Sequence, residues 1–296
     1  MKRKPVMFQH CLTCSADDFV INSTENSIAK TLIDMGYDVW FGNNRGNKYS
    51  IRHNSIDINS KEYWDYSFDE MGTKDIPAMV QKIIGTTGFE KITYFGHSQG
   101  TTQMFVALSD DSTYEQINRQ IDTFFALAPI VYIPNQDSKT VKIIAALKKP
   151  LVKVASAIHL HSILPGQCTT DTKMAWLKQK FCKKFQSVCS VFVKTADKDA
   201  TKYDALDKLH EFLQFAPSGT SFKSFIHFGQ LVSEDKLNPI FRKYNYGSNK
   251  KNKEKYCPSM DLEDSKQVCK VPEYDLRRVK VPVRALACHF DRFGVP

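Results

Sequence analysis

The chain has 296 residues, of which 42% are hydrophobic and 25% are charged, and its mean hydropathy is −0.37. This length supplies one large globular domain or two small ones, and the composition excludes a disordered or fibrous protein. No apolar run approaches the roughly 18 to 20 residues that span a bilayer, so we expect no transmembrane segment.

The formal net charge of +9 comes from the C-terminal two thirds of the chain. Residues 1–100 contain 11 Lys or Arg against 12 Asp or Glu, and the remainder contains 30 against 20. The lysines are scattered, and no recognisable nucleic-acid module accompanies them. We therefore expect a solvated basic face and no nucleic-acid partner, with an anionic surface as the alternative partner.

Short strand-like runs alternate with helical stretches through the first 130 residues. Ser67, with Glu70 three residues later, predicts a capping box at the start of a helix. The alternation of strand and helix predicts a parallel sheet, and the fold class is therefore α/β. The predicted strands are 5–9, 37–41, 91–95 and 121–127. The predicted helices are 27–35, one that begins after Ser67, and 101–108. The first has Ile28, Leu32 and Met35 on its apolar side, and the second has the apolar stripe Ile76, Met79, Val80 and Ile83.

From about residue 128 the periodicity changes. Residues 141–161 and 171–193 are rich in helix formers, residues 244–272 are predicted to be a long exposed loop, and a strand pattern returns only at 279–287. A helical insertion therefore interrupts the α/β core. We expect residues 1–129 to form the first part of the core, 130–273 the insertion, and 274–296 the return to the core.

The eight cysteines are too few for a disulfide scaffold at this length, and they leave the cellular compartment open. Two pairs have a local spacing that could close a disulfide, namely Cys182 with Cys189 and Cys257 with Cys269. Cys11 and Cys14 form a lone CxxC motif that lacks the second ligand pair of a zinc site, so we expect no metal there.

Residues 96–100, Gly-His-Ser-Gln-Gly, match the pattern GxSxG. An apolar strand-like run leads into the motif and a helix-like run leads out of it. In this strand-turn-helix context a strained turn lifts the serine hydroxyl above the edge of the sheet. The motif predicts Ser98 as a nucleophile, and the alternative is a buried glycine-rich turn with an incidental serine.

Several segments together resemble the acid lipases of the gastric and lysosomal type. The longest is residues 36–47, and the others are Gln9-His10 with Leu12, 64–71, 75–78, 96–102, 126–129, 217–221 and 274–276. The resemblance runs in order from about Pro5 to Pro296. It implies an α/β-hydrolase fold, with a mostly parallel sheet and an inserted helical cap and lid, and it implies ester hydrolysis without a metal or organic cofactor.

The resemblance also implies roles for individual residues. Ser98 corresponds to the nucleophile, and the backbone amides of Leu12 and Gln99 correspond to the oxyanion hole. Asp291, at the end of the last strand, corresponds to the triad acid, and Asp197 is the rival candidate.

The resemblance also concerns two histidines and one cysteine. His10 precedes the oxyanion amide, where we expect it to brace the loop. His227 matches a position in the family's cap, where a structural role is expected. Cys11 departs from the family, which has glycine there, and we expect the side chain to strain the loop.

The base of the triad should follow the acid in the chain order of an α/β-hydrolase. None of the five residues after Asp291 is histidine, and all eight histidines precede Asp291. The sequence also begins directly on the strand before the oxyanion loop. We expect a truncation at both ends, and we expect this chain alone not to be a competent lipase; a degenerate paralogue is the rival explanation.

The function expected from these features is that of a carboxylic ester hydrolase, either a triacylglycerol lipase or a steryl ester hydrolase, which forms a serine acyl-enzyme. Its partners would be a lipid ester substrate and a lipid interface. The alternative is a non-catalytic, lipase-like protein that binds lipid or a protein partner, and a third hypothesis is a binder of anionic surfaces. By resemblance the protein is secreted or lysosomal, although no signal peptide is visible.

Overall fold

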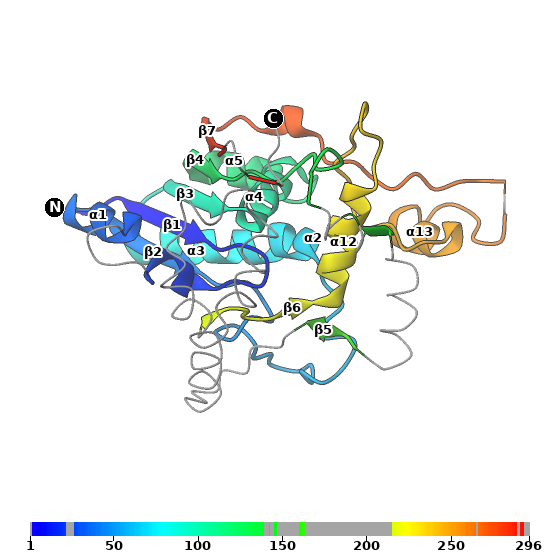
Figure 1. Cartoon of the computed structure of the whole chain (residues 1–296), viewed down its shortest axis with the longest axis horizontal. Helices are drawn as coiled ribbons and strands as arrows, with labels where there is room; N and C mark the ends of the chain where they lie inside the picture. The colour runs from blue at the N-terminus through cyan, green and yellow to red at the C-terminus, as the bar shows by residue number, and fades with distance from the viewer. Residues whose placement is uncertain are drawn as a thin grey trace.

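The structure is a computed structural model that describes residues 2–21, 27–138, 142, 145–146, 160–163, 215–264, 266–288 and 291–292. Its centre is a five-stranded sheet with the strand order β2-β1-β3-β4-β7, in which each neighbouring pair is parallel (Figure 1). This sheet confirms the predicted α/β class. The strands are β1 (Pro5–Gln9), β2 (Asp38–Gly42), β3 (Ile92–His97), β4 (Ile121–Leu127) and β7 (Val283–Leu286).

Helices connect and cover these strands. A second, two-stranded antiparallel sheet pairs β5 (Ser162–Ile163) with β6 (Thr220–Ser221). The described helices are the 3₁₀ turn η1 (Ala16–Phe19), α1 (Ile28–Asp34), α2 (Phe68–Glu70), the π turn η3 (Met71–Asp75), α3 (Ile76–Thr87), α4 (Gln99–Ser109), α5 (Tyr114–Gln120), α12 (Phe222–Val232), α13 (Asn249–Tyr256) and the 3₁₀ turn η5 (Leu276–Arg278).

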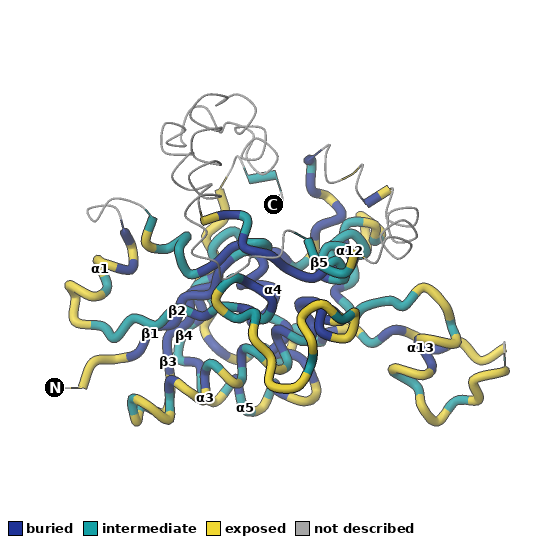
Figure 2. Tube along the Cα trace, turned by 90° about the horizontal axis from the view of Figure 1, so that it is seen from below, coloured by how far each residue is buried: buried dark blue, intermediate teal, exposed yellow. Residues whose placement is uncertain are grey.

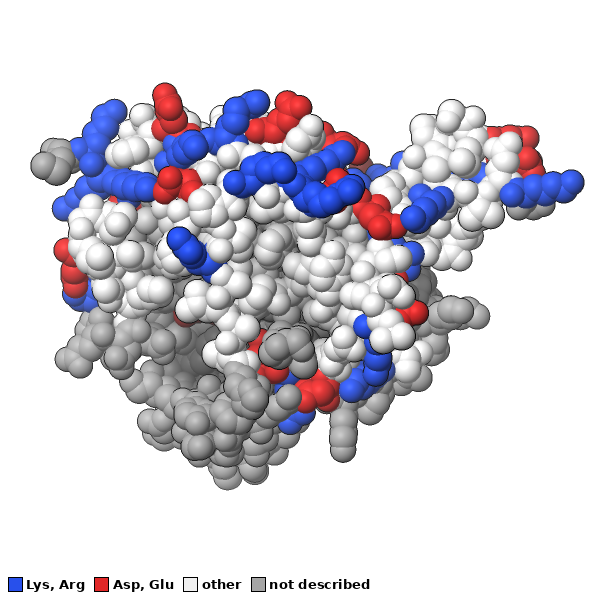
Figure 3. Space-filling view, turned by 90° about the horizontal axis from the view of Figure 1, so that it is seen from above, with Lys and Arg blue, Asp and Glu red and all other residues white. Residues whose placement is uncertain are grey.

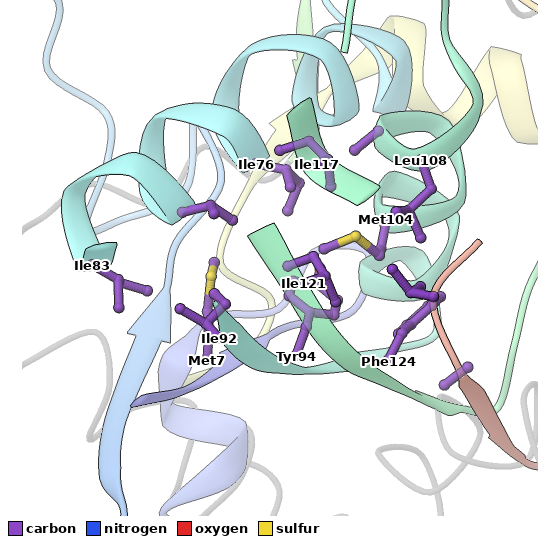
Figure 4. Close-up of a cluster of buried hydrophobic side chains, with 14 residues drawn as sticks. Met7, Ile76, Ile83, Ile92, Tyr94, Met104, Leu108, Ile117, Ile121 and Phe124 are labelled. Carbon is purple, nitrogen blue, oxygen red and sulfur yellow. The ribbon is translucent and has the colours of Figure 1, made fainter. Parts of the chain in front are cut away.

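The larger core lies between the sheet and the helices α3, α4 and α5 (Figure 4). Ile76, Val80 and Ile83 of α3 are buried in it, and Met79 is partly buried, so the predicted apolar stripe is confirmed. The stripe faces the sheet because positions three and four apart lie on one side of a helix. Figure 2 shows the strands as a buried band, with exposed residues on the outer sides of α3 and α5.

The opposite face of the sheet carries an aromatic layer. The rings of Phe95 and Phe125 stack at 4.3 Å, and those of Phe8 and Phe95 at 4.9 Å. Ala29 of α1 is buried against this layer, whereas Ile28 is 44% exposed and Met35 is 66% exposed. The prediction that Ile28 and Met35 lie on the apolar, inward side of this helix was therefore wrong. α1 ends at Asp34, and Met35 is its C-cap, just before the chain enters β2.

The capping box predicted at Ser67 is confirmed. The Ser67 hydroxyl accepts a hydrogen bond from the backbone N–H of Asp69, and the Glu70 carboxylate accepts one from the N–H of Ser67 at 2.7 Å. These contacts satisfy backbone donors that the first turn of a helix cannot pair. They fix the start of a continuous helical segment that passes through η3 into α3.

The segment predicted to be a long loop contains a helix, and this part of the prediction was wrong. Ser248 caps α13 by accepting from the N–H of Lys251, and Lys253 is buried with its ammonium donating to the carbonyl oxygens of Asp261 and Asp264. α13 has no apolar stripe, so periodicity could not reveal it. Its position depends on these contacts and on the disulfide at its C-terminal end described below.

The last strand of the sheet is shorter than the sequence pattern predicted. The strand predicted at 279–287 spans only Val283–Leu286, because η5 precedes it and Pro282 has no N–H for the ladder. The predicted helix 171–193 and most of the predicted helix 141–161 lie outside the described residues. Among the residues that the structure does describe, no helix is both long and apolar enough to cross a bilayer.

On the described part of the surface, positive and negative side chains lie side by side. Figure 3 shows Lys and Arg side chains next to Asp and Glu side chains along one edge of the molecule. Arg277 pairs with Asp275 at 2.7 Å, and Arg278 pairs with Asp111. These pairs fit the expectation of a solvated face, on which such interactions contribute little to stability.

Candidate active site

The GxSxG motif forms a sharp turn between β3 and α4. Ser98 lies between the last residue of the strand and the first residue of the helix, with φ 51° and ψ −114°. A residue with a side chain rarely adopts a positive φ, and such strain persists only where the surrounding structure imposes it. Ser98 is half-buried. The backbone therefore has the geometry that raises a serine hydroxyl at the carboxyl end of a sheet.

Two glycines allow this turn to pack. A Cβ on Gly96 would lie 2.8 Å from the carbonyl carbon and oxygen of Gly100. A Cβ on Gly100 would collide with the carbonyl oxygen of Gln9, at the end of the neighbouring strand β1. The absence of side chains thus lets α4 begin directly against the loop that follows β1. This contact brings the two predicted oxyanion segments together.

Hydrogen bonds hold the backbone of the turn in place. The N–H of Ser98 donates to the carbonyl of Leu127 at the end of β4, at 2.9 Å. The hydroxyl of Thr101 donates to the carbonyl of Ser98 at 2.6 Å and accepts from the N–H of Ile130 at 3.0 Å. Thr102 donates to the carbonyl of Ile130 at 2.7 Å. The turn that holds Ser98 is thereby fixed to the end of β4 and to the segment that follows it.

His10 braces the loop after β1, as we expect from its position in the sequence. Its Nε2 accepts from the backbone N–H of Asn44 at 3.1 Å, so Nδ1 carries the proton and donates to the carbonyl of Cys11 at 2.8 Å. Burial lowers the pKa of His10 to about 4. The ring is therefore neutral at pH 7, and both nitrogens are occupied by the scaffold.

The two predicted oxyanion donors belong to two segments that meet where β1 and β3 end. Gln99 is the first residue of α4, where the helix itself cannot pair the backbone N–H. Leu12 is two residues beyond His10, whose carbonyl oxygen lies close to the Cα of Gly100. Both segments thus meet at the carboxyl end of β1 and β3. The N-terminus of α4 also favours negative charge at this end of the two strands.

Asp291 lies beyond β7 at the same end of the sheet. Its N–H donates to the carbonyl of Cys288 at 3.1 Å, in a turn after the strand. Burial lowers the pKa of His97, the neighbour of Ser98, and the Asp291 carboxylate opposes that shift. The acid thus acts electrostatically on the residue next to the serine. Asp197, the rival acid, lies outside the described residues.

His227 has a structural environment. Its ring stacks on Phe68 with a centroid distance of 3.8 Å, and Nε2 donates to the carbonyl of Arg242 at 3.0 Å. Nδ1 therefore accepts from the hydroxyl of Ser67, at 2.9 Å. Burial lowers the pKa of His227 to about 3. Like His10, it has no free nitrogen with which to serve as a base.

The disulfides were predicted in part. Cys257 and Cys269 are joined, with their Cα atoms 6.1 Å apart, as their spacing suggested. Cys11 and Cys14 are also joined, with their Cα atoms 5.1 Å apart, and this bond was missed. The CxxC spacing is the feature of the sequence that could have indicated this bond. Cys182 and Cys189 lie outside the described residues.

The surroundings of Cys11 and Cys14 include a carboxylate. The two sulfur atoms and a carboxylate oxygen of Asp18 lie within 4.8 Å of one another, the kind of group that could hold a metal ion. The disulfide uses both sulfurs, whereas a metal would require thiolates. Burial and the neighbouring Asp17 raise the pKa of Asp18 to about 7. The donors as they stand do not fit a metal centre.

The sheet and the nucleophile turn define an α/β-hydrolase, and comparison with known proteins agrees. The family model of the alpha/beta hydrolase fold matches residues 4–117. The chain is 34% identical over 284 residues to gastric triacylglycerol lipase of Rattus norvegicus, covering 95% of this chain and 66% of that protein. It is 31% identical over 296 residues to lipase member N of Mus musculus, covering 99% and 68%.

A third relative is lysosomal acid lipase/cholesteryl ester hydrolase of Macaca fascicularis, which is 29% identical over 272 residues, covering 88% of this chain and 64% of that protein. The chain belongs to the acid lipase family of α/β-hydrolases. It spans 57% to 68% of the lengths of these and other curated relatives.

Proposed function

We propose that the protein is a carboxylic ester hydrolase in which Ser98 is the nucleophile. The observation that carries this proposal is the conformation of Ser98, which has a positive φ between a buried strand and the helix α4. Backbone strain of this kind is concentrated at functional sites. The loop after β1 and Asp291 after β7 lie at the same end of the sheet as Ser98, which supports the proposal.

The reaction would proceed in two stages. The Ser98 hydroxyl attacks the carbonyl carbon of the ester while a base accepts its proton, and the N–H groups of Leu12 and Gln99 donate to the oxyanion. The alcohol leaves, and water then hydrolyses the acyl-enzyme. Asp291 would orient the base and stabilise its protonated form. His10 and His227 are not that base, because the scaffold occupies both nitrogens of each ring.

The proposed substrates are esters of long-chain acids, either triacylglycerols or steryl esters, bound at a lipid interface beneath a cap formed by residues 130–273. Tyr132, Leu160 and Phe215, within this segment, expose 40 to 50% of their surface. Of the apolar positions that suggested a covered acyl site, Leu160 and Ile163 are described, whereas Ile143, Ile144, Leu147 and Leu164 lie outside the described residues. The names of two relatives, gastric triacylglycerol lipase and lysosomal acid lipase/cholesteryl ester hydrolase, support these two classes of ester.

We propose a secreted or lysosomal location. The disulfides Cys11–Cys14 and Cys257–Cys269 support this location, because such bonds persist in oxidising compartments and are rare in the cytosol. The gastric and lysosomal names of two relatives agree with it. Peptide mapping of protein from its native source without reductant would test it, and finding all cysteines as free thiols would argue against it.

The nucleophile is tested with a fluorophosphonate probe and a long-chain ester substrate. In any form of the protein that hydrolyses esters, Ser98 should carry the label, and S98A should abolish both labelling and hydrolysis. S55A, at an exposed loop position, is the matched control and should leave both unchanged. Full hydrolysis by S98A would refute the serine mechanism, and lipid binding without hydrolysis would favour the non-catalytic alternative.

A further inference from the structure

The loop that follows β1 contains a disulfide around the proposed oxyanion donor. Cys11 and Cys14 enclose only Leu12 and Thr13, and the N–H of Cys14 also donates to the carbonyl of Cys11 at 3.3 Å. The disulfide therefore closes a ring of four residues that includes Leu12. The disulfide is therefore one of the restraints on the backbone around the Leu12 N–H.

The middle of this loop has few other restraints. His10 holds the carbonyl of Cys11, and the side chain of Asn43 accepts from the N–H of Ala16, so both ends of the loop are fixed to the core. Between them, the carbonyl of Thr13 accepts from the N–H of Ser218 at 2.6 Å. The Thr13 hydroxyl also donates to the carbonyl of Leu12, at 2.6 Å. Within the described part of the chain, these two hydrogen bonds and the disulfide restrain residues 12 and 13.

Thr13 has a backbone conformation that depends on such restraint. Its φ is 60°, which is an outlier for a β-branched residue. Residues in this region persist only where the surrounding structure over-determines them. When the disulfide opens, Thr13 can return to a negative φ, and the peptide group between Leu12 and Thr13 turns with it. The peptide group that carries the Leu12 N–H also carries the Cys11 carbonyl, so its remaining restraints are the hydrogen bonds that this carbonyl accepts from His10 and from the N–H of Cys14.

The reduced state has hydrogen-bond acceptors ready for both thiols. The sulfur of Cys11 lies 3.8 Å from a carboxylate oxygen of Asp18, and that of Cys14 lies 3.3 Å from the carbonyl oxygen of Leu12. A thiol at Cys14 would thus donate to the residue whose N–H is the proposed oxyanion donor. Cys11 is half-buried whereas Cys14 is 5% exposed, so Cys11 is the sulfur that a reductant can reach.

We propose that Cys11 and Cys14 are a thiol–disulfide exchange site whose oxidation state sets the position of the Leu12 N–H, with the disulfide holding the oxyanion hole in its competent form. This inference deepens the proposed function and rests on it. The co-reactant is a dithiol reductant, either a small molecule or a protein with a CxxC site.

The exchange is balanced in atoms and electrons. A thiolate of the reductant attacks the sulfur of Cys11, the Cys11–Cys14 bond breaks, and the electron pair leaves on Cys14, which takes a proton from solvent. The second thiol of the reductant, as its thiolate, then attacks the reductant's own sulfur in the mixed disulfide and releases Cys11, which takes up a proton. The protein gains two electrons and two protons, and the reductant becomes a disulfide.

The first test follows the loop without any catalytic readout. The purified chain is treated with dithiothreitol under native conditions, free thiols are alkylated, and peptide mapping identifies which disulfide has opened. Hydrogen exchange of the peptide spanning residues 10–16 should then speed up at least about tenfold on reduction. Unchanged exchange in protein whose Cys11 and Cys14 are alkylated would overturn the proposal, as would the absence of this disulfide before treatment.

The second test measures how fast a fluorophosphonate labels Ser98 in a form of the protein that hydrolyses esters. Reduction should slow labelling at least about tenfold, because one oxyanion donor contributes roughly 10² to 10³ in rate. The double variant C11S/C14S should label at the slow rate and not respond to reductant. C257S/C269S, which lacks the other described disulfide, is the matched control and should keep the full response. If Ser98 labels in neither state the proposed function fails, and the exchange experiment still decides whether the pair controls the loop.

Discussion

His227, within residues 130–273 that we propose as the cap, provides a test of how this segment packs against the core. Its imidazole stacks on Phe68, accepts from Ser67 and donates to the carbonyl of Arg242. Replacing His227 with Gln removes the stacked ring and leaves at least one of these hydrogen-bond partners unpaired. At pH 7 we expect the free energy of unfolding to fall by about 2 to 3 kcal/mol.

The size of this effect should depend on pH, because burial lowers the pKa of His227 from 6.5 to about 3. Above pH 6.5 the ring is neutral in both the folded and the unfolded chain. Below pH 6.5 the unfolded chain binds a proton that the folded chain does not, so the parent loses up to about 1.4 kcal/mol of stability per pH unit until about pH 3. At pH 5 the loss is about 2 kcal/mol. The variant lacks this term, so its deficit relative to the parent should nearly vanish at pH 5.

Urea unfolding followed by tryptophan fluorescence at pH 7, 6 and 5 measures the difference directly. Phe228 supplies the control, since its ring packs 4.9 Å from that of Phe68 but does not titrate. F228L should therefore be less stable than the parent by the same amount at every pH. A deficit of H227Q that stays constant from pH 7 to pH 5 would refute the argument that His227 is buried as the neutral imidazole.

Further predictions concern the nucleophile turn, the core and the substrate. G100A should lose ester hydrolysis and at least about 1 to 3 kcal/mol of stability in urea unfolding, because its Cβ would collide with the carbonyl of Gln9; full activity would show that α4 can move away. Y274F should cost about 1 to 3 kcal/mol by the same measurement, since it removes the 2.6 Å hydrogen bond to the buried Asp69 carboxylate, and an unchanged midpoint would contradict this. In a form that hydrolyses esters, D291N should lower kcat about 10⁴-fold with the fold intact, and a near-normal kcat would remove Asp291 from the proposed triad. The same form should prefer long acyl esters over acetyl esters and gain activity at an interface; a flat chain-length profile would mean that the apolar cap residues serve only in packing.

Local chemistry accounts for the parts of the fold that were predicted from the sequence. The capping box at Ser67 and the nucleophile turn at Ser98 depend on residues close together in the chain, so their residue types and spacing were sufficient. The parallel sheet followed from the alternation of strand and helix. Family resemblance supplied the proposed roles of Leu12 and Asp291, which no local pattern contains.

Contacts between distant segments decided the rest. α13 has no apolar stripe, and its position depends on the buried ammonium of Lys253 and on a disulfide whose pairing the spacing only suggested. The direction in which α1 faces the sheet depends on the small side chain of Ala29 meeting an aromatic layer built from other strands.

The sequence by itself indicated which residues we propose to carry the chemistry: local spacing pointed to Ser98, and family resemblance pointed to Leu12, Gln99 and Asp291. The tertiary structure decided their environments. His10 and His227 have neutral rings with both nitrogens occupied, because their partners come from segments about 34 and 160 residues away. The disulfide ring around Leu12 lies close to the turn that holds Ser98 because β1 ends against that turn. Burial and partners at such sequence separations arise only when the sheet brings the ends of its strands together.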